Sequence, residues 1–466
     1  MEVLENDHGA HLNKAQSLID AEQYQEALAL LNDTLDDNPD DLTALFQIGE
    51  VLLKTDRIGL AANIYRYLTT KTQRSEVWNN LGRCYQRRES SDEARRCFNM
   101  ALKLDPESPH ARINLGVLDV NEGQPESAKR HALEALERMP ESRQAVDVLA
   151  MAKFHLRDWS GWDDYLYSEG PPFRILRQYC VPQEQEWMGE PDKTVVIYRE
   201  QGLGDEILYA SCLDEVISRS KKVILDVDKR LVGLFKRSFN ADVYGTGYST
   251  DLEWVKRYNI DASAPIGRIP TFFRRQDSDF PGDPYLKPCP HRKRAYRAML
   301  DGLGPGLKVG LAWTGGKKTD SVTRSDSQYR SLSLRLLEPL LRPENHYISL
   351  EYRDDNKSVH DMNTLGIHHW PWITQSQDYD DTAALVNELD YIIAIPTTVV
   401  HLAGALGTPC YCLTPEFPNW RFGLKGDMLW HKSVKLVRDQ GNWRKTIKRL
   451  RHYLETRYHY PRRTGT

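Results

Sequence analysis

The stretch Ser75–Pro106 reads SEVWNNLGRCYQRRESSDEARRCFNMALKLDP, and it contains the clearest structural pattern in the first third of the chain. With Ser75 counted as position 1, small residues stand at positions 8 and 20, and large ones at positions 4, 7, 11 and 24. The small side chains allow two antiparallel helices to approach closely, and the large ones fill the seam between them. Pro106 ends the second helix, because its ring removes a backbone donor and clashes with the preceding turn. The stretch therefore predicts a helical hairpin.

The same pattern recurs along the N-terminal third. One period of 34 residues later it returns at Leu115, Gly116, Ala128, Ala135 and Pro140. Earlier copies begin near His8 and Leu42, and a degenerate fifth begins at Arg143 and runs out at Trp159–Trp162. The pattern resembles the tetratricopeptide repeat at its signature positions. Each hairpin leaves an apolar face open, so we expect residues 8–165 to stack into a superhelix with a polar groove that binds a protein segment.

Composition excludes several classes of protein. The chain has 466 residues, 40% hydrophobic and 27% charged, with a net charge of −4, which is ordinary globular material rather than disordered chain, collagen or coiled coil. Its seven cysteines include no C-x-x-C pair, which argues against a disulfide framework and a zinc ribbon. The acidic start, Met1–Asp7, does not resemble a signal peptide. Tyr391–Leu413 is long enough to span a membrane, but prolines and glycines interrupt it, so we expect a soluble, cytoplasmic protein.

Positive charge gathers at the C-terminal end. His431–Thr466 carries 11 Lys and Arg against two Asp and Glu, a net charge of +9. Such a tail suits nucleic acid or anionic lipid. The simpler interpretation, which we favour, is a terminal helix over Trp443–Tyr458 whose charges are solvated or paired with the acidic body, with no nucleic-acid partner.

The remainder predicts alternating strands and helices. A linker over residues 166–192 precedes a β-branched run at Thr194–Tyr198, a helix from Glu206 to Ile217 and a strand at Val223–Val227. A second series starts at Lys308; it contains strands at Val309–Trp313, Tyr347–Leu350, Tyr391–Ile395 and Cys410–Leu413, and helices at Thr382–Leu389 and Thr398–Leu406. Alternation of this kind indicates parallel sheets. We therefore expect two Rossmann-like lobes, residues 193–300 and 301–466, with ligands bound outside the carboxyl ends of the strands.

The segment Ile395–His401 is one candidate site. Thr397 and Thr398 follow a predicted strand and open a predicted helix, where free backbone N–H groups and the helix dipole favour an anion. The alternative is a threonine that only caps the helix. His401 lies one turn further on the same face, within reach of a ribose or phosphate, unless it is a hydrogen-bonded histidine of the core.

The turn Gly202-Leu203-Gly204-Asp205 is a second candidate. The glycines Gly202 and Gly204 permit close approach of backbone to a ligand, although Ile207 stands where a dinucleotide fingerprint needs a third glycine. Asp205 is either a general base facing the cleft or a helix N-cap.

A third region follows the first strand of the second lobe. Trp313, Gly315 and Gly316 begin a polar stretch, Lys317–Gln328, that we expect to be a loop over the cleft. Arg330 stands just before the next helix, where its guanidinium suits a phosphate, unless it is merely solvated. Asp226-Val227-Asp228 resembles a D-x-D metal motif, but Lys229 and Arg230 suggest a neutralised cap instead.

Three blocks in order resemble one enzyme family. Gly202–Asp205, Arg330–Leu334 and Ala383–Pro409 are similar to the two-lobed GT-B glycosyltransferases related to bacterial heptosyltransferases and to O-linked N-acetylglucosamine transferase. The most similar set within it is bacterial tetratricopeptide–glycosyltransferase proteins. The resemblance implies a nucleotide-sugar donor held by the second lobe, inversion at the anomeric carbon and no required metal or other cofactor.

The resemblance also implies residue roles. Thr397 and Thr398 would hold the diphosphate and His401 the ribose or phosphate, Arg330 would steady the leaving group, Asp205 would be the acceptor base, and Glu351 would contact the nucleotide. Trp420 and Arg421 fall in a segment similar to the family's tail. Heptosyltransferases carry an Asp where this chain has Pro396, which leaves the donor open. A protein Ser/Thr presented by the repeats is the expected acceptor; the alternatives are a glycan acceptor and a scaffold whose lobes have lost catalysis.

Overall fold

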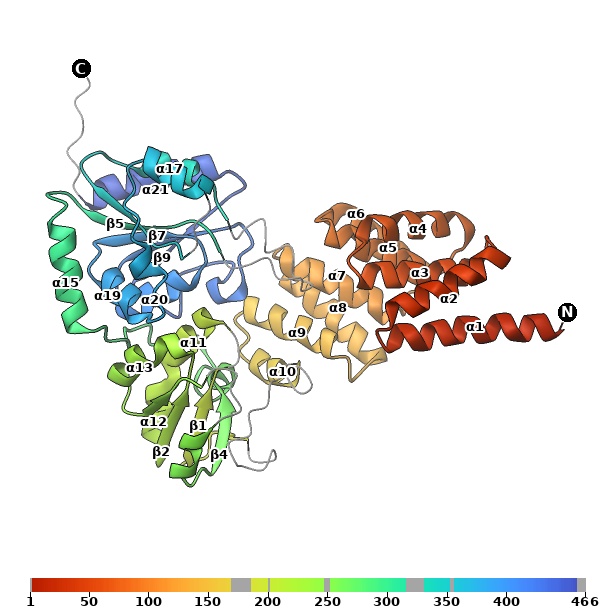
Figure 1. Ribbon diagram of the computed structural model, residues 1–466, viewed down its shortest axis with the longest axis horizontal. Helices are drawn as coiled ribbons and strands as arrows, with labels where there is room; N and C mark the ends of the chain where they lie inside the picture. The colour runs from red at the N-terminus through yellow and green to blue at the C-terminus, as the bar shows by residue number, and fades with distance from the viewer. Residues whose placement is uncertain are drawn as a thin grey trace, which may run out of the picture. The chain divides into compact units, whose positions relative to one another are not determined.

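A computed structural model describes residues 2–168, 186–199, 202–246, 252–315, 331–352 and 356–458 (Figure 1). The chain divides into two compact units. One comprises Met1–Ala152, and the other comprises Lys153–Lys318 and Asp326–Thr466. Among the helices in these ranges, none combines the length and apolar character needed to cross a bilayer.

The first unit is a helical tetratricopeptide array, in which successive helices lie against one another as antiparallel pairs (Figure 1). Its helices are α1 (Glu2–Asp20), α2 (Tyr24–Asp37), α3 (Leu42–Lys54), α4 (Ile58–Lys71), α5 (Ser75–Arg87), α6 (Ser91–Leu104), α7 (Pro109–Asn121), α8 (Pro125–Arg138) and the first part of α9 (Arg143–His155). The hairpin predicted over Ser75–Pro106 is thus α5 and α6.

Glycine sets the distance between paired helices. A Cβ placed on Gly82 would lie 2.5 Å from Phe98 Cε1, and one on Gly49 would lie 2.7 Å from Tyr65 Cζ. The ring of each partner occupies the space that a larger residue at repeat position 8 would need. This is the close approach that the sequence pattern predicts, and it buries both rings completely.

The second unit opens with α10 (Gly161–Ser168) and a parallel sheet of four strands. Its strands are β1 (Thr194–Tyr198), β2 (Lys222–Asp226), β3 (Asp242–Tyr244) and β4 (Ala262–Pro265), in the order β3-β2-β1-β4. The helical segments of this region are α11 (Leu203–Tyr209), η1 (Ala210–Cys212), α12 (Leu213–Arg219), η2 (Lys229–Leu231), α13 (Val232–Ser238), η3 (Glu253–Arg257), η4 (Ile266–Arg268), α14 (Pro270–Phe273) and η5 (Asp277–Asp279). The next helix, α15 (Pro290–Asp301), packs instead against α19 (Asp380–Asn387), beside the second sheet.

A second parallel sheet has five strands. They are β5 (Lys308–Ala312), β6 (His346–Ser349), β7 (Tyr391–Ala394), β8 (Cys410–Thr414) and β9 (Val434–Arg438), in the order β6-β5-β7-β8-β9. The helical segments here are α16 (Leu334–Leu337), η7 (Glu338–Leu340), α17 (Asn356–Thr364), α18 (Pro371–Thr374), α19 (Asp380–Asn387), α20 (Thr398–Leu406), η8 (Trp420–Phe422) and α21 (Trp443–Arg457).

Six strands lie within one residue of their predicted positions, and three were not predicted. The three missed strands, β3, β4 and β9, carry weak local signals: β3 has three residues, β4 ends in proline, and β9 alternates with charge at the sheet edge. Their assignment depends on pairing with a neighbour, which sequence periodicity does not report.

The border between the units falls at Ala152/Lys153, earlier than the predicted end of the array at residue 165. The reason is an aromatic cluster within the second unit. Phe154 stacks on Trp420 at 4.4 Å between ring centroids, and Trp162 meets Trp420 edge-on at 5.5 Å. The Trp162 indole also donates to the carbonyl oxygen of Arg274 at 3.0 Å. The end of α9 and α10 therefore belong to the core of the α/β unit.

The strand order of each sheet indicates where a ligand would bind. In the first sheet the strand order reverses next to β1, which has β2 on one side and β4 on the other; in the second it reverses between β5 and β7. Open parallel sheets bind ligands outside the carboxyl ends of the strands at such reversals. The segments that follow β1, β5 and β7 are therefore where the site is to be sought.

Candidate functional site

Two adjoining cavities lie at these carboxyl ends. The larger has a volume of about 510 Å³, the smaller about 330 Å³, and both are lined by Gly202, Leu203, Thr397 and Thr398. The larger one extends along Thr314, Glu351, Tyr352 and the segment Thr374–Tyr379. The smaller one extends along Asp205, His401, Arg421 and the segment Pro415–Asn419. Residues that follow β1 and residues that follow β7 thus share one depression.

The start of α20 carries an unsatisfied hydroxyl. Thr397 is the N-cap residue, but its side chain makes no capping hydrogen bond, and its Oγ1 is buried with no partner in the described part of the chain. The capping alternative is therefore not what the structure shows. A buried hydroxyl without a partner is costly, so its position at the positive end of a nine-residue helix suits an anionic ligand.

His401 lies one turn into α20 and lines the smaller cavity. Its side chain is buried, its residue is 6% exposed, and Nδ1 has no hydrogen-bond partner among the described residues. Burial, and secondarily the positive charge of Arg421, lowers the pKa of His401 to about 3. At neutral pH the ring is therefore uncharged and offers a hydrogen bond rather than a cation. It packs 5.7 Å from the ring of Phe422 and 5.7 Å from that of His431.

Gly204 brings α11 against α20. A Cβ on Gly204 would lie 3.1 Å from Thr398 Oγ1 and 3.4 Å from Thr398 Cα. The glycine thus permits a close approach between two helix starts, in addition to the approach to a ligand that the sequence suggests. Gly202, the N-cap of α11, lines both cavities.

Asp205 is held in an ion pair rather than used as a cap. Its Oδ1 lies 2.9 Å from Nη2 of Arg421, and both side chains are mostly buried. The same guanidinium donates to Tyr209 Oη at 2.9 Å and to Asn419 Oδ1 at 3.1 Å. Asp205 also lines the smaller cavity. The carboxylate is therefore fixed in direction and open to the depression.

Glu351 organises the end of β5. Its Oε1 accepts the backbone N–H groups of Trp313 at 2.6 Å and Thr314 at 2.8 Å, and its Oε2 accepts the Thr314 hydroxyl. The residue is 3% exposed and lines the larger cavity. Its carboxylate shapes the loop after β5, in addition to any contact with a ligand.

The other predicted residues divide into three groups. Trp313 and Trp420 are buried in the hydrophobic core and line neither cavity. Gly315 ends a described range next to the cavity residue Thr314, whereas Gly316, Arg330 and the stretch Lys317–Gln328 lie outside the described residues.

The Asp226-Val227-Asp228 motif is structural. Asp226 accepts the N–H of Thr246 at 3.0 Å and also its hydroxyl, while Asp228 caps η2 and pairs with Arg230 at 2.9 Å. This is the neutralised cap that the sequence suggested. Within the described ranges no group of three or more His, Cys, Asp and Glu side chains is placed to hold a metal ion.

The sequence reasoning missed three residues at the site. Arg230 and Tyr379 line the larger cavity, and Tyr209 holds Arg421. Arg230 follows the carboxyl end of β2, so the rule that placed the other candidates applies to it as well. Tyr209 stands four residues after Asp205, one helical turn along the same face. No local signal marks Tyr379.

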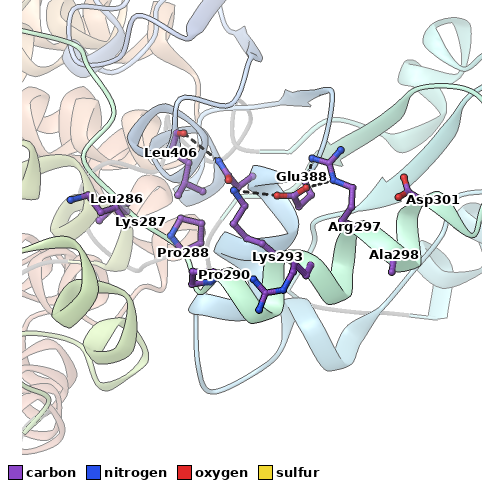
Figure 2. Close-up of a pocket in the computed structure, with 12 residues that line it drawn as sticks. Leu286, Lys287, Pro288, Pro290, Lys293, Arg297, Ala298, Asp301, Glu388 and Leu406 are labelled. Carbon is purple, nitrogen blue, oxygen red and sulfur yellow. Dashed lines mark hydrogen bonds and ion pairs between the residues drawn. The ribbon is translucent and has the colours of Figure 1, made fainter.

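A third cavity, of about 680 Å³, lies along α15 at the opposite end of α20 (Figure 2). Lys293 and Arg297 point into it, but both pair with the buried carboxylate of Glu388, Lys293 at 3.2 Å. Leu406, the last residue of α20, lines it and accepts a hydrogen bond from Asn387. Lys287 and Arg294 also line this cavity, but the negative end of the helix dipole and the carboxylate that Lys293 and Arg297 share make it a poorer anion site than the start of α20.

Known proteins resemble this chain over the repeats and, in one case, over most of its length. Residues 12–76 and 75–108 match tetratricopeptide repeat families. Protein FlbA of Caulobacter vibrioides is 27% identical over 440 residues, which cover 88% of this chain and 72% of FlbA. The general transcriptional corepressor ssn6 of Schizosaccharomyces pombe is 25% identical over 130 residues, 27% of this chain and 12% of that protein. The crystal structure of MamA protein, 14% identical, matches 35% of this chain and 90% of its own with a TM-score of 0.29.

Proposed function

We propose that the α/β unit is a glycosyltransferase that moves a sugar from a nucleotide-sugar donor to an acceptor hydroxyl. In this proposal the two sheet regions are the Rossmann-like lobes of a GT-B enzyme. A cytoplasmic location goes with it, since that is where a pool of such donors is expected.

One observation carries the proposal: Asp205, the start of α20 and His401 line a single depression. Transfer needs a site for the diphosphate and a base beside it. The helix start with its unpartnered Thr397 hydroxyl suits the first, and the carboxylate suits the second. Asp205 follows a strand of the first sheet and the start of α20 follows a strand of the second, which suits a donor and an acceptor bound between the two sheets.

The chemistry follows from this placement. The acceptor oxygen attacks the anomeric carbon from the face opposite the leaving group, and Asp205 takes the proton of the acceptor hydroxyl. The bond between the anomeric carbon and the phosphate oxygen breaks, and its electron pair leaves with the nucleotide. Preorganised N–H groups at the start of α20 stabilise the charge that develops there. Arg330 is proposed as the further cation at this leaving group.

The repeat array is a protein-interaction scaffold of the tetratricopeptide type. Its proposed role is to present a protein segment whose Ser or Thr is the acceptor. A glycan acceptor is the alternative within the same chemistry.

A scaffold with inactive lobes is the second candidate function. The ion pair between Asp205 and Arg421 favours it, because a carboxylate oxygen that is paired with a guanidinium at 2.9 Å is engaged in a structural contact. Pro396, where related heptosyltransferases carry Asp, points the same way.

Nucleotide binding tests the proposal first. UDP, GDP, ADP and CMP at millimolar concentration are each added to the full chain, and the melting temperature is measured. We expect one of them to raise it in the wild type and to act more weakly on Thr397→Val. No shift with any of the four would favour the scaffold.

Acceptor identity is tested by mass spectrometry of proteins from cells that express the wild type or Asp205→Asn. Sugar on protein Ser or Thr in the wild type only supports the proposal. Asp192→Asn is the matched control, because Asp192 is exposed and lines neither cavity. Modified glycans without modified proteins would favour the glycan acceptor, and no modification of either would contradict transfer.

A further inference from the structure

Arg230 is a cation at the larger cavity that the sequence motifs did not assign. It stands in η2, just after the carboxyl end of β2, and lines the cavity together with Thr397 and Thr398. Among the described residues that line the two cavities, Arg230 and Arg421 are the arginines, and no lysine is present. Arg421 is engaged by Asp205, so Arg230 is the cation to consider for a ligand.

The guanidinium of Arg230 is oriented by one carboxylate. Nε donates to Asp228 Oδ1 at 2.9 Å, and Nη2 donates to Asp228 Oδ2 at 3.0 Å. In the described part of the chain, Nη1 has no hydrogen bond or ion pair, and 37% of the side chain is exposed. The fork is therefore preorganised, with one donor nitrogen left for a ligand.

Asp228 does not serve Arg230 alone. Asp228 is shared between Arg230 and Arg199, whose Nη1 lies 3.0 Å from Asp228 Oδ2. Arg199 also approaches the fully buried Glu206 at 3.4 Å. Burial raises the pKa of Glu206 to about 8, so near neutral pH this carboxyl is mostly protonated. The carboxylate of Asp228 is thus shared by two guanidinium groups and neutralises Arg230 only in part, and a protonated Glu206 does not add to that neutralisation.

Arg230 is also tied to the second sheet region. The N–H of Tyr379, which precedes α19, donates to the carbonyl oxygen of Arg230 at 2.9 Å. Tyr379 lines the same cavity. A ligand that reaches both Arg230 and the start of α20 therefore contacts both sheet regions.

We propose that Arg230 is a phosphate-binding residue, contributed by the first sheet region to the phosphoryl groups of the nucleotide bound at the start of α20. This inference rests on the proposed function and adds a residue that its motifs do not include. In this arrangement the first sheet region supplies part of the donor site as well as Asp205.

The test measures affinity by calorimetry with the full chain. The first probe is the nucleotide, among UDP, GDP, ADP and CMP, that binds the wild type. The second probe is inorganic pyrophosphate, measured as a competitor of that nucleotide. We expect Arg230→Gln to weaken both probes by about 10-fold or more, the effect of losing one charge-assisted hydrogen bond. Arg230→Lys keeps the positive charge but not the planar guanidinium, so its affinity for each probe should lie between that of the wild type and that of Arg230→Gln. Arg219→Gln is the control, since Arg219 is exposed at the end of α12 and lines neither cavity.

The outcomes separate this inference from the proposed function. If the wild type binds none of the nucleotides, the proposed function fails and this inference fails with it. If the wild type binds and Arg230→Gln binds equally well, only the role of Arg230 is wrong. A loss of nucleotide affinity with unchanged pyrophosphate affinity would place Arg230 at the base or ribose and overturn the phosphate assignment. Should Arg230→Gln not fold, Arg230→Lys decides alone, because unaltered affinity for both probes would argue against a fork that binds phosphate.

Discussion

Asp205 at the start of α11 and Arg421 in η8 form an ion pair of 2.9 Å that joins the two sheet regions at the edge of the smaller cavity. Arg421 reaches Asp205, Tyr209 and Asn419 at once, and its guanidinium lies 4.9 Å from the ring centre of Trp420. A planar fork on an aromatic face is suited to this arrangement, and an ammonium is not. The pair thus links the candidate base to the aromatic core behind it.

Replacement of Arg421 tests this geometry. Arg421→Met should lower the free energy of unfolding by about 1–3 kcal/mol, because it leaves partly buried acceptors without a donor. Arg421→Lys should be nearly as harmful, since one ammonium cannot serve three groups in a plane. Urea unfolding measures the stability of both variants. The control is Arg219→Met at an exposed position, whose unfolding free energy should lie within about 0.5 kcal/mol of the wild type. Wild-type stability in Arg421→Lys would contradict the role of the fork.

Gly204→Ala tests the contact between the two helix starts. The new Cβ would lie 3.1 Å from Thr398 Oγ1 and 3.4 Å from its Cα, so Thr398 must yield by a few tenths of an ångström. We expect a loss of about 1–2 kcal/mol in unfolding free energy, in the range of modest overpacking. Gly202→Ala is the matched control, because among the described residues its Cβ would meet only Asp205 Oδ2, at 3.6 Å, and its φ is −76°. Equal stability of the two variants would show that the helix starts are not in close contact.

Stability should depend on pH through Glu206. Burial raises its pKa from 4.5 to about 8, against the opposing effect of Arg199. Below the unfolded value both states hold the proton; between the two values only the folded state does. The stability contributed by the protonated form is therefore full below about pH 4.5 and is lost as pH rises through about 8.

Glu206→Gln isolates this effect. Between about pH 4.5 and pH 8 the wild type should lose unfolding free energy relative to the variant, by up to roughly 1.4 kcal/mol per pH unit. Urea unfolding at several pH values measures it, and exposed Glu253→Gln is the control, with a side chain 71% exposed. A constant difference across this range would mean that Glu206 is ionised throughout.

Trp162→Ala should destabilise the α/β unit. Its buried indole packs on Phe154, at 4.6 Å, and Trp420, so its removal should cost about 3–5 kcal/mol. Tryptophan fluorescence reports this unit, because ten of the 11 tryptophans stand at residue 159 or later. The fluorescence transition should move to lower urea. If it does not move, residues 153–168 belong with the repeats after all.

Gly82→Ala tests the repeat pattern itself. The added methyl would lie 2.5 Å from Phe98 Cε1, so α5 and α6 must separate, at about 1–3 kcal/mol. Gly59→Ala is the matched control, because nothing lies within 4 Å of its Cβ and alanine favours a helix by up to about 1 kcal/mol. Circular dichroism during thermal unfolding measures both. A neutral Gly82→Ala would contradict close packing at this repeat position.

Much of the fold could be predicted because its signals are local. The 34-residue period, the β-branched runs and the Thr398–Leu406 helix all follow from neighbouring residues, and the structure places these elements within a few residues. The compact units meet at Ala152/Lys153, whereas the sequence pattern of the repeats extends to residue 165, because the aromatic residues that follow the border pack on Trp420, far along the chain.

The candidate residues Thr397, Thr398, His401 and Asp205 were also predicted from local sequence, as residues that follow predicted strands. Their roles within the structure were not: the ion pair of Asp205 with Arg421, the contact of Gly204 with Thr398 and the position of Arg230 at the cavity each join distant segments.

Local sequence is enough to specify the repeat array, the alternation of strands and helices and the turns that carry the polar residues, because periodicity and turn chemistry act over a few residues. Tertiary structure alone decided which turns meet. Sheet order and the packing of α11 on α20 bring Asp205 beside Arg421 and set Arg230 at the cavity of Thr397. Such encounters depend on long-range packing, which leaves no periodic trace in the chain.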